Sequence, residues 1–124
     1  YKGPKIDPTT KTRQEIELPL EPEHEGADRF DKLLRALGFR PVAQVRKKRR
    51  SATVPWHGCQ VQIVLDVVDD VGTFAELEMT SNEDGLEHAK QLVLSLAREL
   101  SLGNNERRSY LELLLQKPAL SEKP

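Results

Sequence analysis

Acidic and basic side chains alternate with other residues in four segments of the chain. The charged members of these segments are Arg13, Glu15, Glu17, Lys47, Arg49, Asp66, Glu76 and Glu78. Lys and Arg neutralise phosphate oxygens and donate hydrogen bonds to them, whereas clustered carboxylates hold Mg²⁺ or Mn²⁺ against the same oxygens. A set that combines both signs is therefore what a polyphosphate site with a divalent cation requires.

β-Strands must position these side chains, because a period of two is typical of a strand with two different faces. We expect strands over residues 12–18, 41–50, 60–68 and 73–79. Pro55-Trp56-His57-Gly58 predicts a turn between the second and third strands. Asp69-Asp70-Val71-Gly72 predicts a hairpin between the third and fourth.

Three helices are expected where apolar residues recur at helical spacing. They cover residues 27–37, 85–100 and 106–116. Gly38 and Gly103 follow the first two, as glycine commonly does at helix C-termini. The apolar stripes of these helices can cover one face of the sheet, which leaves the charged face to enclose a ligand.

Two architectures account for the alternating strands. In an ordinary antiparallel sheet the charged faces simply lie in water. In an α+β antiparallel barrel with helices packed on the outside, the charged faces line a polar interior, where opposite signs offset the cost of burial. We favour the barrel, because the helices can cover the outer face of the sheet and the charged positions are of the kinds that a polyphosphate site demands.

Size and composition limit the chain to one domain or part of one. Its 124 residues are too few for two independent cores, and 37% hydrophobic with 31% charged residues is typical of a soluble globular protein. No run is apolar enough to span a bilayer or to act as a signal peptide, which predicts no membrane partner and a cytoplasmic location. The lone Cys59 and three scattered histidines argue against disulfides and zinc clusters.

Several segments, in the right order along the chain, resemble the later part of the CYTH superfamily, the triphosphate tunnel metalloenzymes. The passage from Leu65-Asp66-Val67-Val68 to Glu76-Leu77-Glu78 is similar to the closing hairpin of the family, where an Asp and a Glu-x-Glu pair point into the tunnel. Further matching segments are Tyr1-Lys2-Gly3-Pro4, Lys11-Thr12-Arg13, Leu37-Gly38-Phe39, and Ser109-Tyr110-Leu111-Glu112, the last of which resembles a C-terminal helix of bacterial class IV adenylyl cyclases.

The resemblance implies a tunnel that binds a nucleoside or other organic triphosphate with Mg²⁺ or Mn²⁺. The metal ligands it implies are Asp66, Glu76, Glu78 and Glu15, with Glu76 and Glu78 also catalytic. The triphosphate contacts it implies are Lys2, Arg13, Lys47 and Arg49, and Glu17 would also lie on the tunnel face. The implied activity is either adenylyl cyclase, from ATP to cyclic AMP, or triphosphatase, and a homodimer is compatible with it.

The chain departs from the family pattern at its start. The family's opening strand with Glu-x-Glu-x-Lys is not found, since Pro19 stands where the lysine would follow Glu15-Ile16-Glu17. The first residue is Tyr1 rather than Met. We therefore expect residues 1–117 to be the C-terminal part of a CYTH-like domain, with an incomplete barrel, followed by a polar tail at 118–124. Whether this chain alone is an enzyme stays open.

Two other functions fit parts of the sequence. The basic run 46–50 is typical of a nucleic-acid patch, but a strand divides its members between two faces, and the acidic remainder argues against a phosphate-backbone footprint. Nucleic acid is therefore disfavoured as a partner. The second function is that of a noncatalytic barrel remnant that binds polyphosphate or a partner, and the missing strands add weight to it. Absence of turnover by the longer protein would indicate this function.

Overall fold

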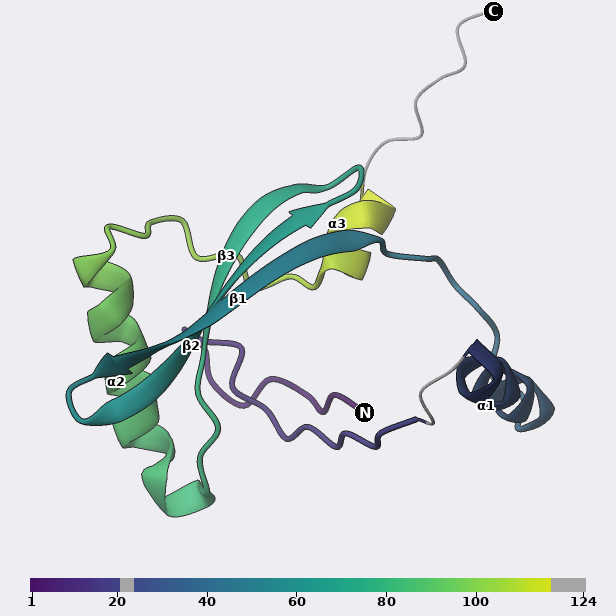
Figure 1. The fold of residues 1–124 in the computed structure, drawn as a ribbon, viewed down its shortest axis with the longest axis horizontal. Coiled ribbons are helices and arrows are strands. Elements are labelled where there is room, and N and C mark those ends of the chain that lie inside the picture. Colours follow the sequence, from purple (N-terminus) through teal and green to yellow (C-terminus); the bar gives the residue numbers. More distant parts are fainter. Residues whose placement is uncertain (21–23, 117–124) are drawn as a thin grey trace, which may run out of the picture. The chain divides into compact units, whose positions relative to one another are not determined.

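The computed structural model describes residues 1–20 and 24–116 (Figure 1). Two compact units divide the chain, Tyr1–Ala43 and the residues from Gln44 onward. The predicted polar tail at 118–124 lies outside the described residues. No helix among the described residues is long and apolar enough to cross a membrane.

The second unit is built on an antiparallel sheet of three consecutive strands, β1 (Lys47–Trp56), β2 (Cys59–Val68) and β3 (Gly72–Glu78). Figure 1 shows that the long β1–β2 hairpin is strongly twisted. His57 and Gly58 both have positive φ, 47° and 79°, as a two-residue turn of type I′ requires. Both predicted turns are therefore present, and the strands between them have nearly the predicted bounds.

Strand register decides which side chains share a face of the sheet. Arg49 pairs with Asp66 across β1 and β2, and Asp66 pairs with Phe74 across β2 and β3. Because alternate residues of a strand point to the same side, Lys47 and Glu76 belong to this face as well. The register thus places cations of β1, a carboxylate of β2 and a carboxylate of β3 on one surface.

Strand β2 and helix α2 (Leu86–Glu99) supply the core of the second unit. Its buried apolar side chains are Val61, Val64, Val68, Ala89, Leu92 and Leu96. The spacing of three and four residues in α2 gives the helix one apolar stripe. Trp56 Nε1 donates a hydrogen bond to Ser95 Oγ over 2.8 Å, which ties the end of β1 to α2. A short 3₁₀ turn, η1 (Glu83–Gly85), leads into α2.

Helix α3 (Tyr110–Gln116) begins at a capping box. Glu112 N donates to Ser109 Oγ over 3.1 Å, and Ser109 N donates back to the Glu112 carboxylate. This reciprocal pair satisfies two backbone donors that a helix start leaves without partners. In Figure 1 the helix lies beside the β2–β3 end of the sheet, away from α2.

The first unit contains helix α1 (His24–Ala36) and two paired extended segments. The helix ends at Gly38, whose φ of 92° needs glycine, with Phe39 N donating to Leu34 O. In the extended segments Gly3 N donates to Gln14 O and Ile16 N donates to Tyr1 O, both over 2.9 Å. The predicted glycine-terminated helix is therefore present.

The structure corrects two strand predictions. Residues 12–18 form only a bridge between Lys2 and Glu15, because the next hydrogen bond along the pair, from Ile6 N to Thr12 O, is out of register with that bridge by one residue. The strand expected from residue 41 begins at Lys47, since its partner β2 ends at Val68 before the turn.

Helix boundaries also differ from those expected, and α1 begins at His24 rather than at residue 27. Helix α2 ends before Ser101, which takes the left-handed conformation with φ of 53° that was expected of Gly103. Helix α3 begins at its capping box rather than at residue 106. Local hydrogen bonds of Ser and Glu side chains and of the backbone therefore set both ends, more than glycine or apolar spacing does.

The α+β class is confirmed, and the described residues form an open sheet rather than a closed barrel. β1 and β3 are its two edge strands, and neither pairs with another strand among the described residues. A barrel would need further strands at these edges.

Candidate functional site

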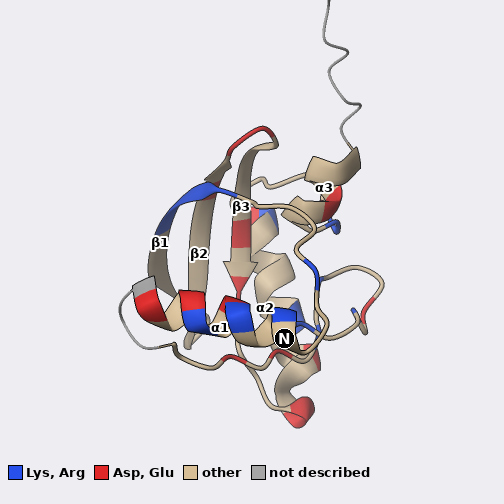
Figure 2. Ribbon diagram, turned by 90° about the vertical axis from the view of Figure 1, so that its right-hand side faces the viewer, with Lys and Arg blue, Asp and Glu red and all other residues tan. Residues whose placement is uncertain are grey.

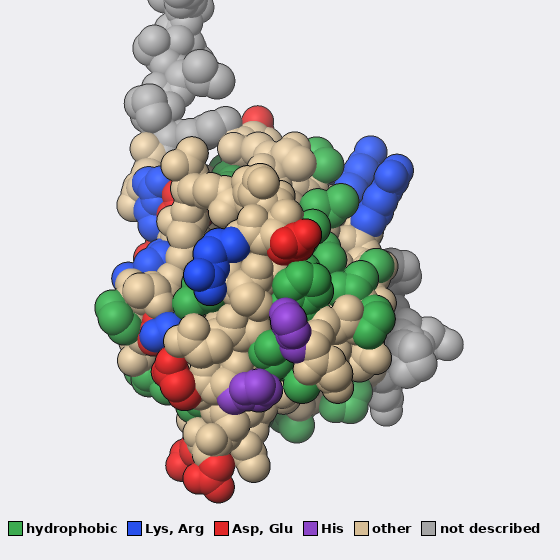
Figure 3. Space-filling view, turned by 90° about the vertical axis from the view of Figure 1, so that its left-hand side faces the viewer, with side chains coloured by type: hydrophobic (Ala, Val, Ile, Leu, Met, Phe, Trp, Pro, Cys, Tyr) green, Lys and Arg blue, Asp and Glu red, His purple; other side chains and the backbone are tan. Residues whose placement is uncertain are grey.

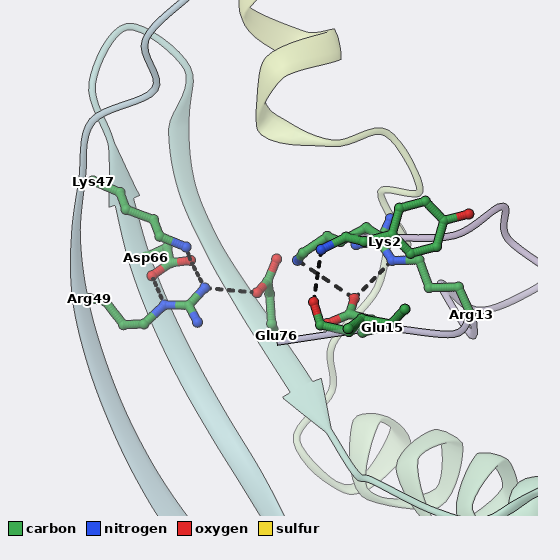
Figure 4. Close-up of polar contacts among 9 residues, drawn as sticks. Lys2, Arg13, Glu15, Lys47, Arg49, Asp66 and Glu76 are labelled. Carbon is green, nitrogen blue, oxygen red and sulfur yellow. Dashed lines mark hydrogen bonds and ion pairs between the residues drawn. The ribbon is translucent and has the colours of Figure 1, made fainter. Parts of the chain in front are cut away.

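Asp66 is the centre of a polar cluster on one face of the sheet (Figure 4). Its side chain is fully buried, with 0% of its surface exposed. Arg49 Nε donates to Oδ1 over 2.8 Å, and Arg49 Nη2 donates to Oδ2 over 2.6 Å. Lys47 Nζ at 3.4 Å and the Tyr110 hydroxyl at 3.0 Å donate to Oδ2. We call Lys47, Arg49, Asp66, Glu76 and Tyr110 the Asp66 cluster.

The arrangement follows from strand register. Arg49 lies directly opposite Asp66, so its planar guanidinium reaches both carboxylate oxygens in the bidentate geometry that Arg favours. Lys47, two residues earlier on the same face, reaches the same carboxylate diagonally. Only alternate members of the basic run 46–50 can take part, as the sequence predicts.

Strand β3 adds a second carboxylate to the cluster. Glu76 Oε2 accepts a hydrogen bond from Arg49 Nη2 over 3.1 Å, so one guanidinium joins two carboxylates. Figure 2 shows basic residues along β1 and acidic residues along β3, on either side of β2. Glu78 lies two residues further on the same face of β3, opposite Gln62.

Helix α3 contributes Tyr110 from above this face. The Tyr110 ring lies 5.0 Å from the Phe74 ring, centroid to centroid, and Lys47 Nζ lies 5.4 Å from its centroid. The second contact has the geometry of a cation–π interaction. Tyr110 therefore contacts a cation, a carboxylate and an aromatic ring of the sheet at once.

These contacts fix the charges of the cluster. The hydrogen bonds from Arg49, and after them those from Tyr110 and the charge of Lys47, lower the pKa of Asp66 to about 2. The same hydrogen bond raises the pKa of Arg49. Burial, followed by hydrogen bonds to Glu76 and Asp66, raises the pKa of Tyr110 above its ordinary value. At neutral pH the cluster therefore combines an ionised aspartate, two cations and a neutral phenol.

The cations remain accessible although the aspartate is not. The side chains of Lys47 and Arg49 are each 36% exposed, and that of Glu76 is 24% exposed. A buried aspartate excludes the interpretation of this face as a purely solvated one. Chemically, the cluster presents two oriented cations that an anion can reach.

The first unit contains its own small group of charges. Arg13 Nε donates to Glu15 Oε1 over 2.9 Å, and Lys2 Nζ lies 3.6 Å from the same oxygen (Figure 4). The hydrogen bond from Arg13 is the main cause of the lowered pKa of Glu15. Glu17 is exposed. Three of the predicted site residues of this unit therefore contact one another.

The predicted site residues thus form two groups, one in each unit. Lys47, Arg49, Asp66 and Glu76 meet in the second unit, with Glu78 further along β3. Lys2, Arg13 and Glu15 meet in the first. That both groups serve one ligand stays a prediction.

The Asp66 cluster does not by itself fit a divalent cation. Within residues 1–20 and 24–116, no group of three or more His, Cys, Asp or Glu side chains is arranged to hold a metal ion. Both Asp66 oxygens already accept hydrogen bonds from basic side chains, which would have to leave for a cation to bind. The metal-ligand roles of Asp66, Glu76, Glu78 and Glu15 therefore stay predictions without support from this geometry.

Sequence reasoning assigned no role to Tyr110. The Ser-x-x-Glu spacing of Ser109 and Glu112 could have located the start of α3 and hence the position of Tyr110. Its contact with Asp66, 44 residues earlier, has no signal in the local sequence.

Other residue types with chemical potential lie apart from the cluster. Figure 3 shows histidine side chains at the surface of another face, among hydrophobic and polar groups. His57 and His88 are both exposed, and Cys59 is half-buried beside the β1–β2 turn. We therefore assign them no role in the Asp66 cluster.

Comparison with known proteins gives three matches. The CYTH domain family model matches residues 1–110. A Methanocaldococcus jannaschii protein with the name "Putative adenylate cyclase MJ0240" is 34% identical over 116 residues, which are 91% of this chain and 62% of that protein. The solved structure of the PH1819 protein from Pyrococcus horikoshii OT3 matches with a TM-score of 0.80 and 40% identity, over 95% of this chain and 64% of that chain. The chain thus spans less than two thirds of the length of either relative.

Proposed function

The chain belongs to the CYTH domain family, and we propose that the cations of its Asp66 cluster bind the phosphates of an organic triphosphate. The complete protein would be an adenylyl cyclase or a triphosphatase. A curated relative with the name of an adenylate cyclase supports the first of these activities.

The orientation of Lys47 and Arg49 by a buried carboxylate carries this proposal. Long basic side chains lose conformational entropy when a ligand fixes them, and prior fixing by Asp66 reduces that loss. Asp66 also offsets the repulsion between the two cations when no ligand is bound. Their exposed surfaces are then available to phosphate oxygens.

Arg13 and Lys2 of the first unit are a second set of phosphate ligands in this proposal. Glu15 holds Arg13 in the same way as Asp66 holds Arg49, by a hydrogen bond to Nε. The repeated pairing of a cation with a carboxylate supports a common use. Each set would neutralise negative charge on phosphate oxygens.

In the complete protein the open sheet would continue into the barrel that encloses the triphosphate. The unpaired edges of β1 and β3 are places where further strands can add. The greater length of both relatives supports such additional strands. Helices would then cover the outside of the barrel, while Lys47, Arg49 and Glu76 face the interior.

The reaction would be attack on a phosphorus atom of the bound triphosphate. In a cyclase a ribose hydroxyl attacks the phosphorus nearest the sugar and pyrophosphate leaves, whereas in a triphosphatase water attacks and phosphate leaves. Lys47 and Arg49 would orient the phosphates and stabilise the negative charge on their oxygens. Both reactions can use these contacts.

Enzymes of the family typically use divalent metals. When bound, Mg²⁺ or Mn²⁺ would polarise phosphate oxygens. The described residues do not fit such a cation by themselves, and the proposed phosphate contacts of Lys47 and Arg49 do not depend on one.

A noncatalytic polyphosphate- or partner-binding domain is the second candidate. The chain spans only 62% of its curated relative, so the parts needed for turnover need not be present. The complete protein separates the two: formation of cyclic AMP or release of phosphate from ATP with Mg²⁺ or Mn²⁺ supports the enzyme, and tripolyphosphate binding without turnover supports the second candidate.

Replacement of neighbouring lysines tests the binding site. Lys47→Ala removes a cation of the cluster, whereas Lys48→Ala removes the same charge from the opposite, exposed face of β1. We expect the dissociation constant of tripolyphosphate, measured by calorimetry on the complete protein, to rise about tenfold for Lys47→Ala. For Lys48→Ala it should change by less than about twofold. Equal effects of both variants, or no binding by the unmodified protein, would refute the proposed site.

A further inference from the structure

Tyr110 connects helix α3 to the phosphate-binding side of the sheet through contacts with Asp66, Lys47 and Phe74, beside its interaction with Glu76. Its hydroxyl donates to Asp66 Oδ2 over 3.0 Å, and its ring contacts Lys47 Nζ and Phe74. The side chain is partly buried in these contacts. No charged partner is added to Asp66 by this hydrogen bond, because the phenol is neutral.

The position of Tyr110 is defined by the capping box of α3. Ser109 and Glu112 fix the first turn of the helix through their reciprocal hydrogen bonds, and Tyr110 is the first residue of that turn. Phe74, directly opposite Asp66 in the sheet, packs against the ring from the β3 side. The hydroxyl therefore approaches Asp66 from a rigid frame.

Asp66 Oδ2 accepts hydrogen bonds from more than one donor. Arg49 Nη2 at 2.6 Å and Lys47 Nζ at 3.4 Å both point to it, and the phenol supplies a further hydrogen bond. The phenol adds this hydrogen bond without adding a third positive charge beside the carboxylate.

We propose that Tyr110 is a positioning residue for triphosphate binding, which acts by fixing Asp66 and Lys47 rather than by touching the ligand. This inference rests on the proposed function of the cluster. Loss of the hydroxyl leaves Asp66 free to rotate toward other partners, and Lys47 and Arg49 then lose their common orientation. The cost of ordering them is transferred to the binding step.

Tyr110→Phe tests the hydrogen bond while the ring is kept. We expect the dissociation constant of inorganic tripolyphosphate, measured by calorimetry on the complete protein, to rise about fivefold. The matched control is Ser95→Ala, which also removes one hydroxyl that bonds between a helix and the sheet, but at Trp56. It should leave the dissociation constant within about twofold.

A double-mutant cycle separates positioning from general stability. If Tyr110 acts through Lys47 and Asp66, Tyr110→Phe should weaken binding by less than about twofold when Lys47→Met is already present. Ser95→Ala should add its small effect equally in both backgrounds. Equal effects of Tyr110→Phe with and without Lys47→Met would refute the inference.

Rescue gives a second, independent measurement. Incorporation of 4-aminophenylalanine at position 110 restores a donor on the ring and should return the affinity to within about twofold of the unmodified protein. If the unmodified protein binds tripolyphosphate and Lys47→Ala weakens it, but Tyr110→Phe does not, the inference alone fails. If the unmodified protein does not bind tripolyphosphate, the proposed function fails and the inference with it.

Discussion

At the scale of single residues, Asp66 determines the character of the cluster. It is the only buried charged side chain found in the described parts of the chain, and every donor around it is basic or phenolic. Removal of one partner from a buried ion pair is costly, because the other charge is left without compensation. In the folded protein Arg49 and Asp66 therefore depend on each other, and the paired guanidinium stays oriented toward the exposed face.

The lowered pKa of Asp66 predicts a specific acid sensitivity. Folding lowers this pKa from an ordinary value of 3.8 to about 2, so the folded state binds the proton less well than the unfolded state. The stabilisation is complete above about pH 4 and is lost as the pH falls toward about 2, with a magnitude of about 1 to 2 kcal/mol. Denaturant unfolding at several pH values in this range measures it.

Asp66→Asn should remove this dependence. We expect the variant to be less stable than the unmodified protein at pH 7, with the difference narrowing toward pH 2. Asp69→Asn is the matched control, since Asp69 is exposed in the β2–β3 turn, and it should change stability by less than about 0.5 kcal/mol. If the difference in the free energy of unfolding between Asp66→Asn and the unmodified protein stays constant from pH 7 to pH 2, the lowered pKa of Asp66 is not the cause of the acid sensitivity.

At the scale of elements, turns and caps place the cluster more than strand propensity does. The turn at His57 and Gly58 sets the register that puts Arg49 opposite Asp66. The capping box sets where α3 begins and so where Tyr110 lies. A shift of either element by one residue would turn the functional side chains to the other face.

The capping box can be tested by a pair of substitutions. Ser109→Ala removes the Oγ acceptor for Glu112 N and should destabilise the start of α3 by about 1 kcal/mol. Ser109→Thr keeps the acceptor and serves as the control. Hydrogen exchange at the Glu112 and Leu113 amides should accelerate about fivefold in the first variant and little in the second. Unchanged exchange in Ser109→Ala would show that packing alone holds the helix start.

At the scale of the whole molecule, the open question is whether the two charge groups serve one ligand. Each unit pairs basic side chains with a carboxylate, Lys2 and Arg13 with Glu15 in the first and Lys47 and Arg49 with Asp66 in the second. The family match extends across both units, from residue 1 to residue 110. A shared triphosphate would make the effects of both groups appear in one binding constant.

Lys2→Ala tests the shared ligand. Lys2 is 64% exposed and its contact with Glu15 is long, so its removal should not disturb the fold. We expect the dissociation constant of tripolyphosphate to rise about threefold to tenfold in the complete protein, with a weaker dependence on salt. Lys32→Ala on the exposed surface of α1 is the control. Equal affinities for Lys2→Ala and the unmodified protein would exclude Lys2 from the site.

Local sequence patterns were sufficient to predict the central strands and the first hairpin of this protein. Alternation gave the central strands, the glycine-containing turn at Gly58 gave the first hairpin, and the split of residues 46–50 between two faces correctly put Lys47 with Arg49. These features depend on neighbours within a few residues, so a local pattern contains them. The strand expected at 12–18 is absent because its pairing slips by one residue between Gly3 and Ile6 of the opposite segment, which the alternation within 12–18 does not specify.

How the charged side chains are paired depends on the folded arrangement of distant elements. That Asp66 is buried, that it accepts hydrogen bonds from Arg49, and that Tyr110 reaches it from 44 residues away all depend on the register of the sheet and on where α3 packs. Such contacts result from the folded arrangement of distant elements, and side-chain types alone do not specify them. For this reason the same carboxylate that looks like a metal ligand in the sequence is, in the folded protein, the partner of two cations and a phenol.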